Sequence, residues 1–429
     1  MPARKWWIAL LVLAASAIGW ILGRAGAPAP AEPTTASPPR AGQAEPAPER
    51  RTVHGQTTSA EALTALAYVD GTVDPEREKT GVLLHRRDET SPGANLYCSR
   101  DLRTAFLLDL DGSILKRWRF PHRGLDHCEL LPDGSILGLI QDRAVIQVDG
   151  DSKVVWSHES EVHHSFFRTA AGELWILARR PRKVAGLHPR QRVYEDRIEI
   201  LDPSGRLIRE ISLLDAFLAS PYRFLLPSVA DRELPPEQPG REPVLDLLHA
   251  NQVEVFDGSL ASRSPLFARG NFLVSFRNIS AVALFDAGAS RILWLWGPSN
   301  LAYPHHPSVL PSGNLLIFNN GTRESEVLEL DPLQLSVVWR YRPGPEFFTA
   351  TRGSCQRLPN GNTLITESNK GYVFEVNGKG EKVWVWANPL FLEGNKRAYV
   401  WRMERYGPER LTFLRPDGAG ATPGRAASE

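Results

Sequence analysis

Histidine is the residue type in this chain whose placement most strongly suggests chemistry. Of the eleven histidines in 429 residues, six stand at matching points of an internal repeat. These six are His127, His163, His164, His249, His305 and His306. A neutral imidazole can attack an electrophile, move a proton or bind a metal ion. If the repeat brings its matching points together, the sequence predicts a polar site built mainly of imidazoles.

Two further polar residues belong to the same candidate site. Arg277 interrupts an otherwise apolar segment, where a buried guanidinium needs an anionic ligand or a carboxylate such as Glu254. Asn251 shares one face of a predicted strand with His249, because side chains along a strand alternate with a period of two. Several histidines could hold a metal ion, but a cation beside a divalent metal is unfavourable unless an anion bridges them. We therefore expect an anion-binding site with no metal and no cofactor.

The elements that must position these residues are short strands. An apolar run, a turn and a second β-rich segment recur six times, with turns at Asp109, Asp149, Asp202, Asp286, Asp331 and Asn377. Five of the six second segments carry a Trp, and most hairpins are followed by another turn and strand, such as LPSGNLLIF. Four strands in about 40 to 50 residues are typical of a propeller blade. The predicted fold class is therefore all-β, a six-bladed β-propeller, with a β-sandwich as the weaker interpretation.

One spacing between turns is longer than the others, at 84 residues from Asp202 to Asp286. The β pattern lapses near 213–248, where a segment with helical spacing precedes a proline-rich loop. We expect a helical insertion there. The propeller is predicted to span 59–414, with a disordered tail over 415–429.

The first 58 residues have the composition of an anchor and a spacer. Residues 6–23 carry no charge, and eighteen residues in a helix span about 27 Å, close to the thickness of a bilayer core. Residues 1–24 are thus predicted to be a cytoplasmic tip and a single transmembrane helix, with a cleavable signal peptide as the alternative. A linker rich in Pro and Ala follows over 25–58. This arrangement predicts a single-pass protein of the inner (cytoplasmic) membrane whose folded part lies on the periplasmic or extracytoplasmic side.

Charge and cysteine content exclude some classes of protein. A net charge of +1 disfavours nucleic acid as a partner. Three cysteines are too few and too scattered to predict a disulfide framework, and the chain has no CxxC pair for zinc.

Several segments carry a resemblance to a known family. They are HHSFFRTAAGELWIL, HANQVEVF, FLVSFRNISAVALFD and HHPSVLPSGNLLIFNNG. They resemble the bacterial arylsulfotransferases, the aryl-sulfate sulfotransferase family, and the resemblance covers most of residues 80–390. It implies an exported six-bladed propeller that moves a sulfuryl group from a phenolic sulfate donor to a phenolic acceptor without the nucleotide donor PAPS. In agreement, the chain lacks a phosphate-binding P-loop motif.

The resemblance also implies roles for the candidate residues. The family's transient sulfohistidine corresponds to His305, with His306 as the alternative if the turns differ in register by one residue. The family's remaining catalytic histidines and arginine correspond to His164, His249 and Arg277.

These residue types suit the implied reaction. Arg277 and His249 would stabilise negative charge on the sulfuryl oxygens, and His164 or His249 would act as general acid and base. The expected substrate-binding residues are Asn251, His306, His163 and His127.

Two other functions fit parts of the sequence. A non-catalytic envelope scaffold would bind an anionic ligand or a protein partner where the predicted histidines meet at the mouth of the propeller channel, with the basic loop 179–192 as a docking site. A quinoprotein-like dehydrogenase would need acidic calcium ligands, for which the sequence offers no convincing set. The sequence does not define the oligomeric state.

Overall fold

The computed structural model describes residues 71–227, 244–288 and 291–414. These residues are mostly strand and turn, with one α-helix, α2 (Leu213–Ala219). Short 3-10 helices occur at Pro221–Leu225, Pro265–Phe267, Ser368–Lys370, Pro408–Arg410 and Thr412–Leu414. Within the described ranges, no helix is long and apolar enough to cross a membrane. The predicted anchor (1–24), linker (25–58) and tail (415–429) lie outside the described residues.

Six sheets of four or five strands contain most of the described strands. Sheet 1 consists of β29 (Met403–Tyr406), β3 (Ala94–Ser99), β4 (Thr104–Leu108) and β5 (Ile114–Arg119). Sheet 2 consists of β6 (Leu125–Leu130), β7 (Ile136–Ile140), β8 (Ala144–Val148) and β9 (Val154–Glu159). Sheet 3 consists of β10 (Val162–Arg168), β11 (Leu174–Arg182), β12 (Arg192–Leu201) and β13 (Leu207–Ser212), with β14 (Val244–Leu245) beside β12.

The second half of the chain forms the other three sheets. Sheet 4 consists of β15 (Ala250–Val255), β16 (Phe272–Phe276), β17 (Ala281–Phe285) and β18 (Ile292–Trp296). Sheet 5 consists of β19 (Pro304–Val309), β20 (Leu315–Asn319), β21 (Glu326–Asp331) and β22 (Ser336–Tyr341). Sheet 6 consists of β23 (Ser354–Arg357), β24 (Thr363–Glu367), β25 (Tyr372–Val376), β26 (Lys382–Ala387) and β2 (Gly81–His85). A small sheet pairs β1 (Gly71–Val73), β28 (Lys396–Ala398) and β27 (Phe391–Leu392).

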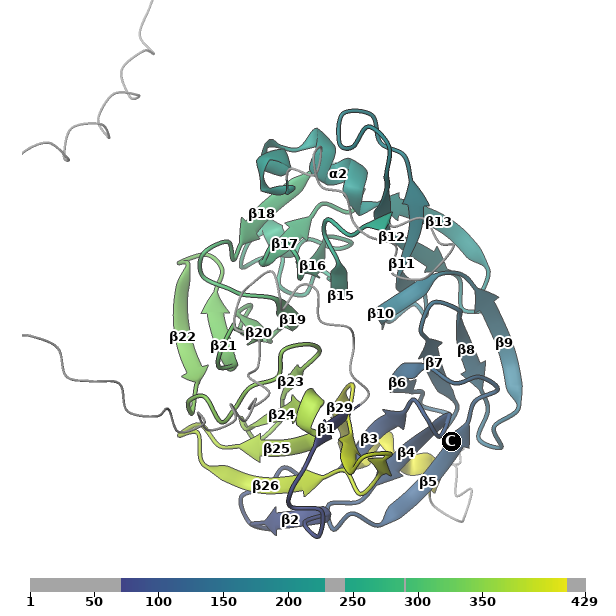
Figure 1. Ribbon diagram of the computed structural model, residues 1–429, viewed down its shortest axis with the longest axis vertical. Helices are drawn as coiled ribbons and strands as arrows, with labels where there is room; N and C mark the ends of the chain where they lie inside the picture. The colour runs from purple at the N-terminus through teal and green to yellow at the C-terminus, as the bar shows by residue number, and fades with distance from the viewer. Residues whose placement is uncertain (1–70, 228–243, 289–290, 415–429) are drawn as a thin grey trace, which may run out of the picture. The chain divides into compact units, whose positions relative to one another are not determined.

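Each large sheet contacts the next, and sheet 6 returns to sheet 1. Figure 1 shows the sheets around a common centre, with β29, β6, β10, β15, β19 and β23 nearest to it. We call these six the inner strands. Inner strands contact neighbouring sheets, as β6 does with β3, β19 with β16, and β29 with β24. The described part of the chain is therefore all-β and propeller-like, as the sequence predicted.

Strands from both ends of the described chain join the sheets across this closure. β2 pairs with β26 on the outside of sheet 6, and β29 pairs with β3 as the inner strand of sheet 1. Sheet 1 therefore contains the last of the described strands, and sheet 6 contains one of the first described strands. Opening the ring would break two antiparallel strand pairs at once.

Five of the six predicted hairpin turns join the outer two strands on the main path of a sheet, and the sixth, at Asn377, joins β25 to β26, outside which β2 is added. In the first, Oδ1 of Asp109 accepts the backbone N–H groups of Asp111 and Ser113. Asp149, Asp202 and Asn377 make the same pair of hydrogen bonds. This side-chain turn explains why the recurrent position is Asp or Asn.

The tryptophans of the repeat tie neighbouring sheets together. Nε1 of Trp118 on β5 donates to the carbonyl oxygen of Gly134, and Nε1 of Trp384 on β26 donates to that of Leu110. Both rings are fully buried. Each therefore adds a directional bond to the apolar contact between sheets.

The predicted helical insertion is present where the structure describes it. Ser212 caps α2 by accepting the N–H of Asp215, and Phe217 packs edge-on against Phe276 of sheet 4. The proline-rich part of the insertion, 228–243, lies outside the described residues.

The cysteines correct one expectation from the sequence. Cys98 on β3 and Cys128 on β6 form a disulfide that joins sheets 1 and 2, with their Cα atoms 6.5 Å apart. Their separation of 30 residues gave no sign of pairing, because only the contact between two sheets brings β3 beside β6. Cys355 is free and buried.

Replacing both Cys98 and Cys128 with Ser should lower the free energy of unfolding by about 3–4 kcal/mol, because the bridge closes a loop of 30 residues. Urea denaturation of the oxidised protein measures the change. Cys355→Ser, which breaks no covalent link, is the matched control and should cost less. Equal unfolding midpoints for the double variant and the wild type would contradict this role of the bridge.

Candidate functional site

The predicted histidines lie on or beside four of the inner strands. His127 is on β6, His163 and His164 are on β10, His305 and His306 are on β19, and His249 directly precedes β15. The sequence placed them just before these strands, which is correct for His249 alone. The others lie inside the strands, because the pairing of each strand begins earlier than its apolar pattern.

A break in strand register occurs at each of these places. The breaks fall at Leu125–His127, Val162–Phe166, Ala250–Gln252 and His305–Ser308. The backbone φ is +61° at His164, +55° at His249 and +46° at His306, in the left-handed region that side chains rarely adopt. Bulges of this kind redirect side chains and are frequent beside active sites.

His305 uses one ring nitrogen to bind the protein. Its Nδ1 lies 2.9 Å from the carbonyl oxygen of Tyr303 and 2.7 Å from Oδ1 of Asn320. The Asn320 amide is oriented by its NH2 group, which donates to the carbonyl oxygens of Thr349 and Arg352. Both partners of Nδ1 are therefore acceptors, so Nδ1 carries the ring proton and Nε2 carries the lone pair. Nε2 is buried and has no hydrogen-bond partner among the described residues.

The surroundings of His305 keep its ring neutral. Burial and then the positive charge of Arg277 lower the pKa of His305 from 6.5 to about 3. The Arg277 guanidinium lies 5.0 Å from the centre of the Tyr303 ring, which belongs to the residue that holds His305. An imidazole with a buried, available lone pair is in the form needed for nucleophilic attack.

Arg277 lies at a different point from the one predicted. It is the first residue after β16 rather than inside a strand, and its backbone N–H donates to the carbonyl oxygen of His249 at 3.1 Å. Its Nη1 donates to Oδ1 of Asn278 at 3.0 Å. A backbone hydrogen bond thus links Arg277 directly to a second predicted site residue.

Asn251 joins sheets 4 and 5 beside His305. Its Nδ2 donates to the carbonyl oxygen of Pro304 at 2.8 Å, and its Oδ1 accepts the hydroxyl of Ser275. Asn251 therefore fixes the backbone that leads into His305.

Arg402, which the sequence analysis missed, lies beside another group of predicted residues. Its Nη1 donates to Nε2 of His127 at 2.8 Å, and its Nη2 donates to Oε1 of Gln252 at 2.6 Å. Burial and then the Arg402 charge lower the pKa of both His127 and His306 well below the ordinary value. Arg402 directly precedes β29, so it reaches the site only because the ring closes.

The remaining histidines contact one another. Nε2 of His249 lies 3.2 Å from Nε2 of His164, and Nδ1 of His164 lies 2.9 Å from Nδ1 of His163. Asp246 adjoins His249, and Asp196 adjoins His163. The sequence analysis missed both carboxylates. Asp246, three residues before His249, could have been found by its spacing, whereas Asp196 offers no local signal.

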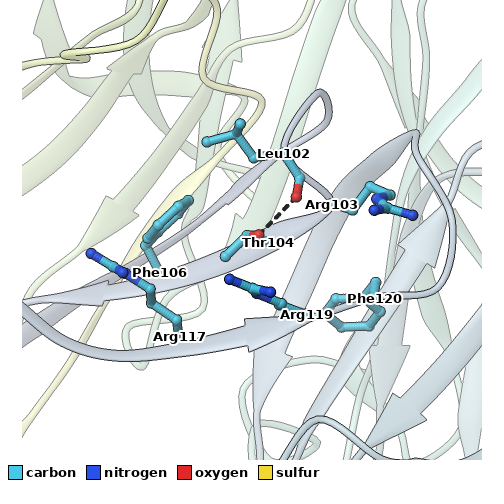
Figure 2. Close-up of a pocket in the computed structure, with 7 residues that line it drawn as sticks. All are labelled: Leu102, Arg103, Thr104, Phe106, Arg117, Arg119 and Phe120. Carbon is cyan, nitrogen blue, oxygen red and sulfur yellow. Dashed lines mark hydrogen bonds between the residues drawn. The ribbon is translucent and has the colours of Figure 1, made fainter.

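A separate pocket lies away from this cluster. It has a volume of about 390 Å³ and is drawn in Figure 2 over β4 and β5. Its lining residues are Leu102, Arg103, Thr104, Phe106, Arg117, Arg119 and Phe120. None of these is a predicted site residue. Over the described ranges, no group of three or more His, Cys, Asp or Glu side chains is arranged to hold a metal ion.

Comparison with known families matches residues 127–388 to the arylsulfotransferases (ASST). The match covers more than half of the chain. The chain belongs to this family. The matched range contains all eight predicted site residues, whereas Arg402 of this arylsulfotransferase-family chain lies beyond it. No curated protein matches the chain.

Solved structures similar to this arylsulfotransferase-family chain are distant. A protein of unknown function from Bacteroides caccae is 14% identical, with a TM-score of 0.48, over 73% of this chain and 98% of that chain. A functionally unknown protein from Desulfotomaculum acetoxidans DSM 771 is 11% identical, with a TM-score of 0.42, over 72% and 98%. Virginiamycin B lyase from Staphylococcus aureus is 12% identical, with a TM-score of 0.39, over 71% and 87%. These likenesses are too weak to bear on function.

The neutral state of His305 predicts how stability depends on pH. An unfolded His titrates near 6.5, whereas the pKa of folded His305 is about 3. As the pH falls below 6.5, the unfolded chain gains a proton here and the folded chain does not. His305 should therefore lower the free energy of unfolding by about 1.4 kcal/mol per pH unit on acidification.

Urea denaturation at several values between pH 7 and pH 4.5 tests this. The stability of the wild type should fall more steeply than that of His305→Gln, which has no imidazole to protonate. Parallel curves for the two proteins would show that His305 titrates normally.

Proposed function

We propose that this protein is a PAPS-independent arylsulfotransferase that moves a sulfuryl group between phenolic compounds through a covalent intermediate on His305. The observation that carries the proposal is Nε2 of His305, which is buried, holds the ring lone pair and has no hydrogen-bond partner in the described ranges. Membership of the family supports the class of reaction.

The reaction is a pair of displacements at sulfur. First, Nε2 of His305 attacks the sulfur of a phenolic sulfate, the bond from sulfur to the aryl oxygen breaks, and a phenolate leaves. Next, the oxygen of an acceptor phenol attacks the same sulfur, and the bond from sulfur to Nε2 breaks. Covalent catalysis of this kind replaces one difficult transfer with two easier ones.

Charge near His305 suits the anionic substrate. The positive charge of Arg277 acts on His305. Its position supports a role in stabilising the sulfuryl oxygens as negative charge builds up in each displacement. The Arg277 guanidinium lies over the Tyr303 ring, and the carbonyl oxygen of Tyr303 accepts from Nδ1 of His305. Tyr303 therefore contacts both the positive charge and the proposed nucleophile.

The hydrogen bonds favour His305 over His306 as the nucleophile. Nδ1 of His306 accepts the backbone N–H of Cys355 at 3.4 Å, so the ring proton of neutral His306 belongs on Nε2. His306 therefore lacks a free lone pair. We assign it, with His127, His163 and Asn251, to shaping the substrate-binding surface, and we assign acid–base work to His164 and His249.

The proposal includes the arrangement and location of the whole chain. We take the six sheets to be the blades of a six-bladed propeller that begins near residue 59, tethered to the inner membrane by residues 1–24 and exposed in the periplasm. The Cys98–Cys128 disulfide supports an oxidising compartment of this kind. The membrane tether rests on the uncharged stretch 6–23.

A non-catalytic scaffold that docks through its basic loop 179–192 receives less support. Arg179 pairs with Asp142, Arg180 with Glu195, and Arg182 with Asp215. These ion pairs already neutralise much of the charge that an acidic partner would bind.

An assay with 4-nitrophenyl sulfate as donor and phenol as acceptor tests the proposed function. The wild type should release nitrophenol and form phenyl sulfate, and His305→Ala should lose at least about a thousandfold in kcat, as expected when a covalent nucleophile is removed. His306→Ala is the comparison from the same strand: it should raise KM by altering the binding surface but keep most of the His305-dependent kcat. Mass spectrometry of donor-treated protein should find one added SO3 group on His305.

The identity of the modified residue decides between the alternatives. An SO3 adduct on His306, or equal loss of activity in both variants without any adduct, would contradict His305 as the nucleophile. If the wild type released no nitrophenol with a range of acceptors, the scaffold interpretation would replace the enzyme.

A further inference from the structure

Three imidazoles and two carboxylates form one connected series of side-chain contacts beside His305. Asp246 Oδ2 lies 2.5 Å from His249 Nδ1, and His249 Nε2 lies 3.2 Å from His164 Nε2. His164 Nδ1 then lies 2.9 Å from His163 Nδ1, and His163 Nε2 lies 3.6 Å from Asp196 Oδ1. All five residues come from sheet 3, the start of sheet 4 and the segment between them.

Neutral imidazoles beside an ionised Asp246 allow one direction for the protons in this series. With Asp246 ionised and His249 neutral, His249 donates from Nδ1 and accepts at Nε2. His164 then donates from Nε2 and accepts at Nδ1, and His163 donates from Nδ1 and accepts at Nε2. Among the described residues, the group that faces Nε2 of His163 and could donate to it is a protonated Asp196, whose Oδ1 lies 3.6 Å away. Every imidazole is neutral in this arrangement.

The two carboxylates differ in the way that this direction requires. Oδ2 of Asp246 accepts the hydrogen bond from His249 Nδ1, and this favours the ionised carboxylate. Burial and then the charge of Asp246 raise the pKa of Asp196 well above its ordinary value. The nearby cation Arg179 acts on both carboxylates and is itself paired with Asp142.

The Asp196 end of this series of contacts is isolated from solvent. Asp196 and His163 are each 2% exposed. Nε2 of His163 and Oδ2 of Asp196 are buried without a hydrogen-bond partner in the described part of the chain. Their 3.6 Å separation is longer than a hydrogen bond, and contacts of this kind commonly shorten when substrate binds.

We propose that Asp196 stores the proton that the two half-reactions exchange, and that His163 and His164 carry it between Asp196 and the substrate oxygen. This inference rests on the proposed sulfuryl transfer at His305. His164 would touch the substrate, whereas Asp196 and His163 are positioning residues that act through it. Asp246 holds His249 in the tautomer that accepts from His164.

The proton balance closes over one cycle. When the donor phenolate leaves, its oxygen takes the proton from His164 Nε2. His164 Nδ1 takes the proton from His163 Nδ1, and His163 Nε2 takes the proton from Asp196, which becomes a carboxylate. When the acceptor phenol attacks sulfur, its proton enters at His164 Nε2 and the same steps run in reverse. No proton is exchanged with solvent.

The variant Asp196→Asn tests whether Asp196 holds the exchanged proton. The Asn side chain has nearly the same size but no proton to release, and it can keep only one of the two contacts of Asp196 Oδ1, which accepts the Ala250 N–H and faces His163 Nε2. Phenol release should be measured in a single turnover with no acceptor present, which isolates the first half-reaction. For phenyl sulfate, whose phenolate is basic, the rate should fall by about a hundredfold or more. For 4-nitrophenyl sulfate, whose phenolate leaves without protonation, it should fall by less than about threefold.

Two further variants separate proton storage from structural damage. His163→Gln should show the same dependence on leaving group, and the double variant should be no slower than either single one, because the two residues act as a unit. Asp246→Asn is the matched control, the same substitution at the ionised carboxylate. It should lower the rate of phenol release from both donors by a similar factor.

The outcomes are distinguishable. If Asp196→Asn slowed phenol release from both donors equally, the proposed role of Asp196 in holding the proton would be wrong, while sulfuryl transfer at His305 would be unaffected. A wild type that releases phenol from neither donor would overturn the proposed function as well. Infrared difference spectra give a readout independent of activity: a protonated carboxyl band at neutral pH should disappear in Asp196→Asn and persist in Asp246→Asn. Absence of that band in the wild type would overturn the proposal.

Discussion

The centre of this protein buries imidazole rings next to arginine side chains, and this is tolerable only while the rings stay neutral. A protonated ring beside Arg277 or Arg402 would place two positive charges together in a poorly solvated environment. Local hydrogen bonds select one neutral tautomer at His305 and at His306. At His305 that acceptor pair, Tyr303 and Asn320, leaves Nε2 as the buried lone pair on which the proposed chemistry depends.

The propeller-like ring makes this arrangement possible. The site residues come from β6, β10, β15 and β19 and from the turn after β16, so no single sheet contains the site. Register breaks in the inner strands turn the histidines out of the regular alternation. The closure by β2 and β29, together with the Cys98–Cys128 bridge, holds these strands at fixed separations.

Around His305 the site has two regions with different properties. One contains His305, Arg277 and Tyr303 and is suited to holding an anion at a nucleophile. The other contains the imidazoles that connect Asp246 to Asp196 and is suited to moving a proton. Asn251, two residues after His249, donates to the carbonyl oxygen of Pro304 next to His305 and so links the two regions. In the proposed mechanism, this separation assigns the attack on sulfur to one group and the transfer of the phenolic proton to others.

The sequence by itself determined the features that depend on local chemistry. The turn at Asp109 and its repeats follow from side-chain hydrogen bonds within five residues, and the equivalent histidines follow from the same repeat. Only the tertiary structure decided the features that depend on strands distant in sequence. Arg402 binds His127 across 275 residues, Cys98 pairs with Cys128, and Asp196 meets His163 across sheet 3. The tautomer of His305 also belongs to this second group, because Asn320, which helps to set it, is itself oriented by Thr349 and Arg352 from the segment that leads into the next sheet.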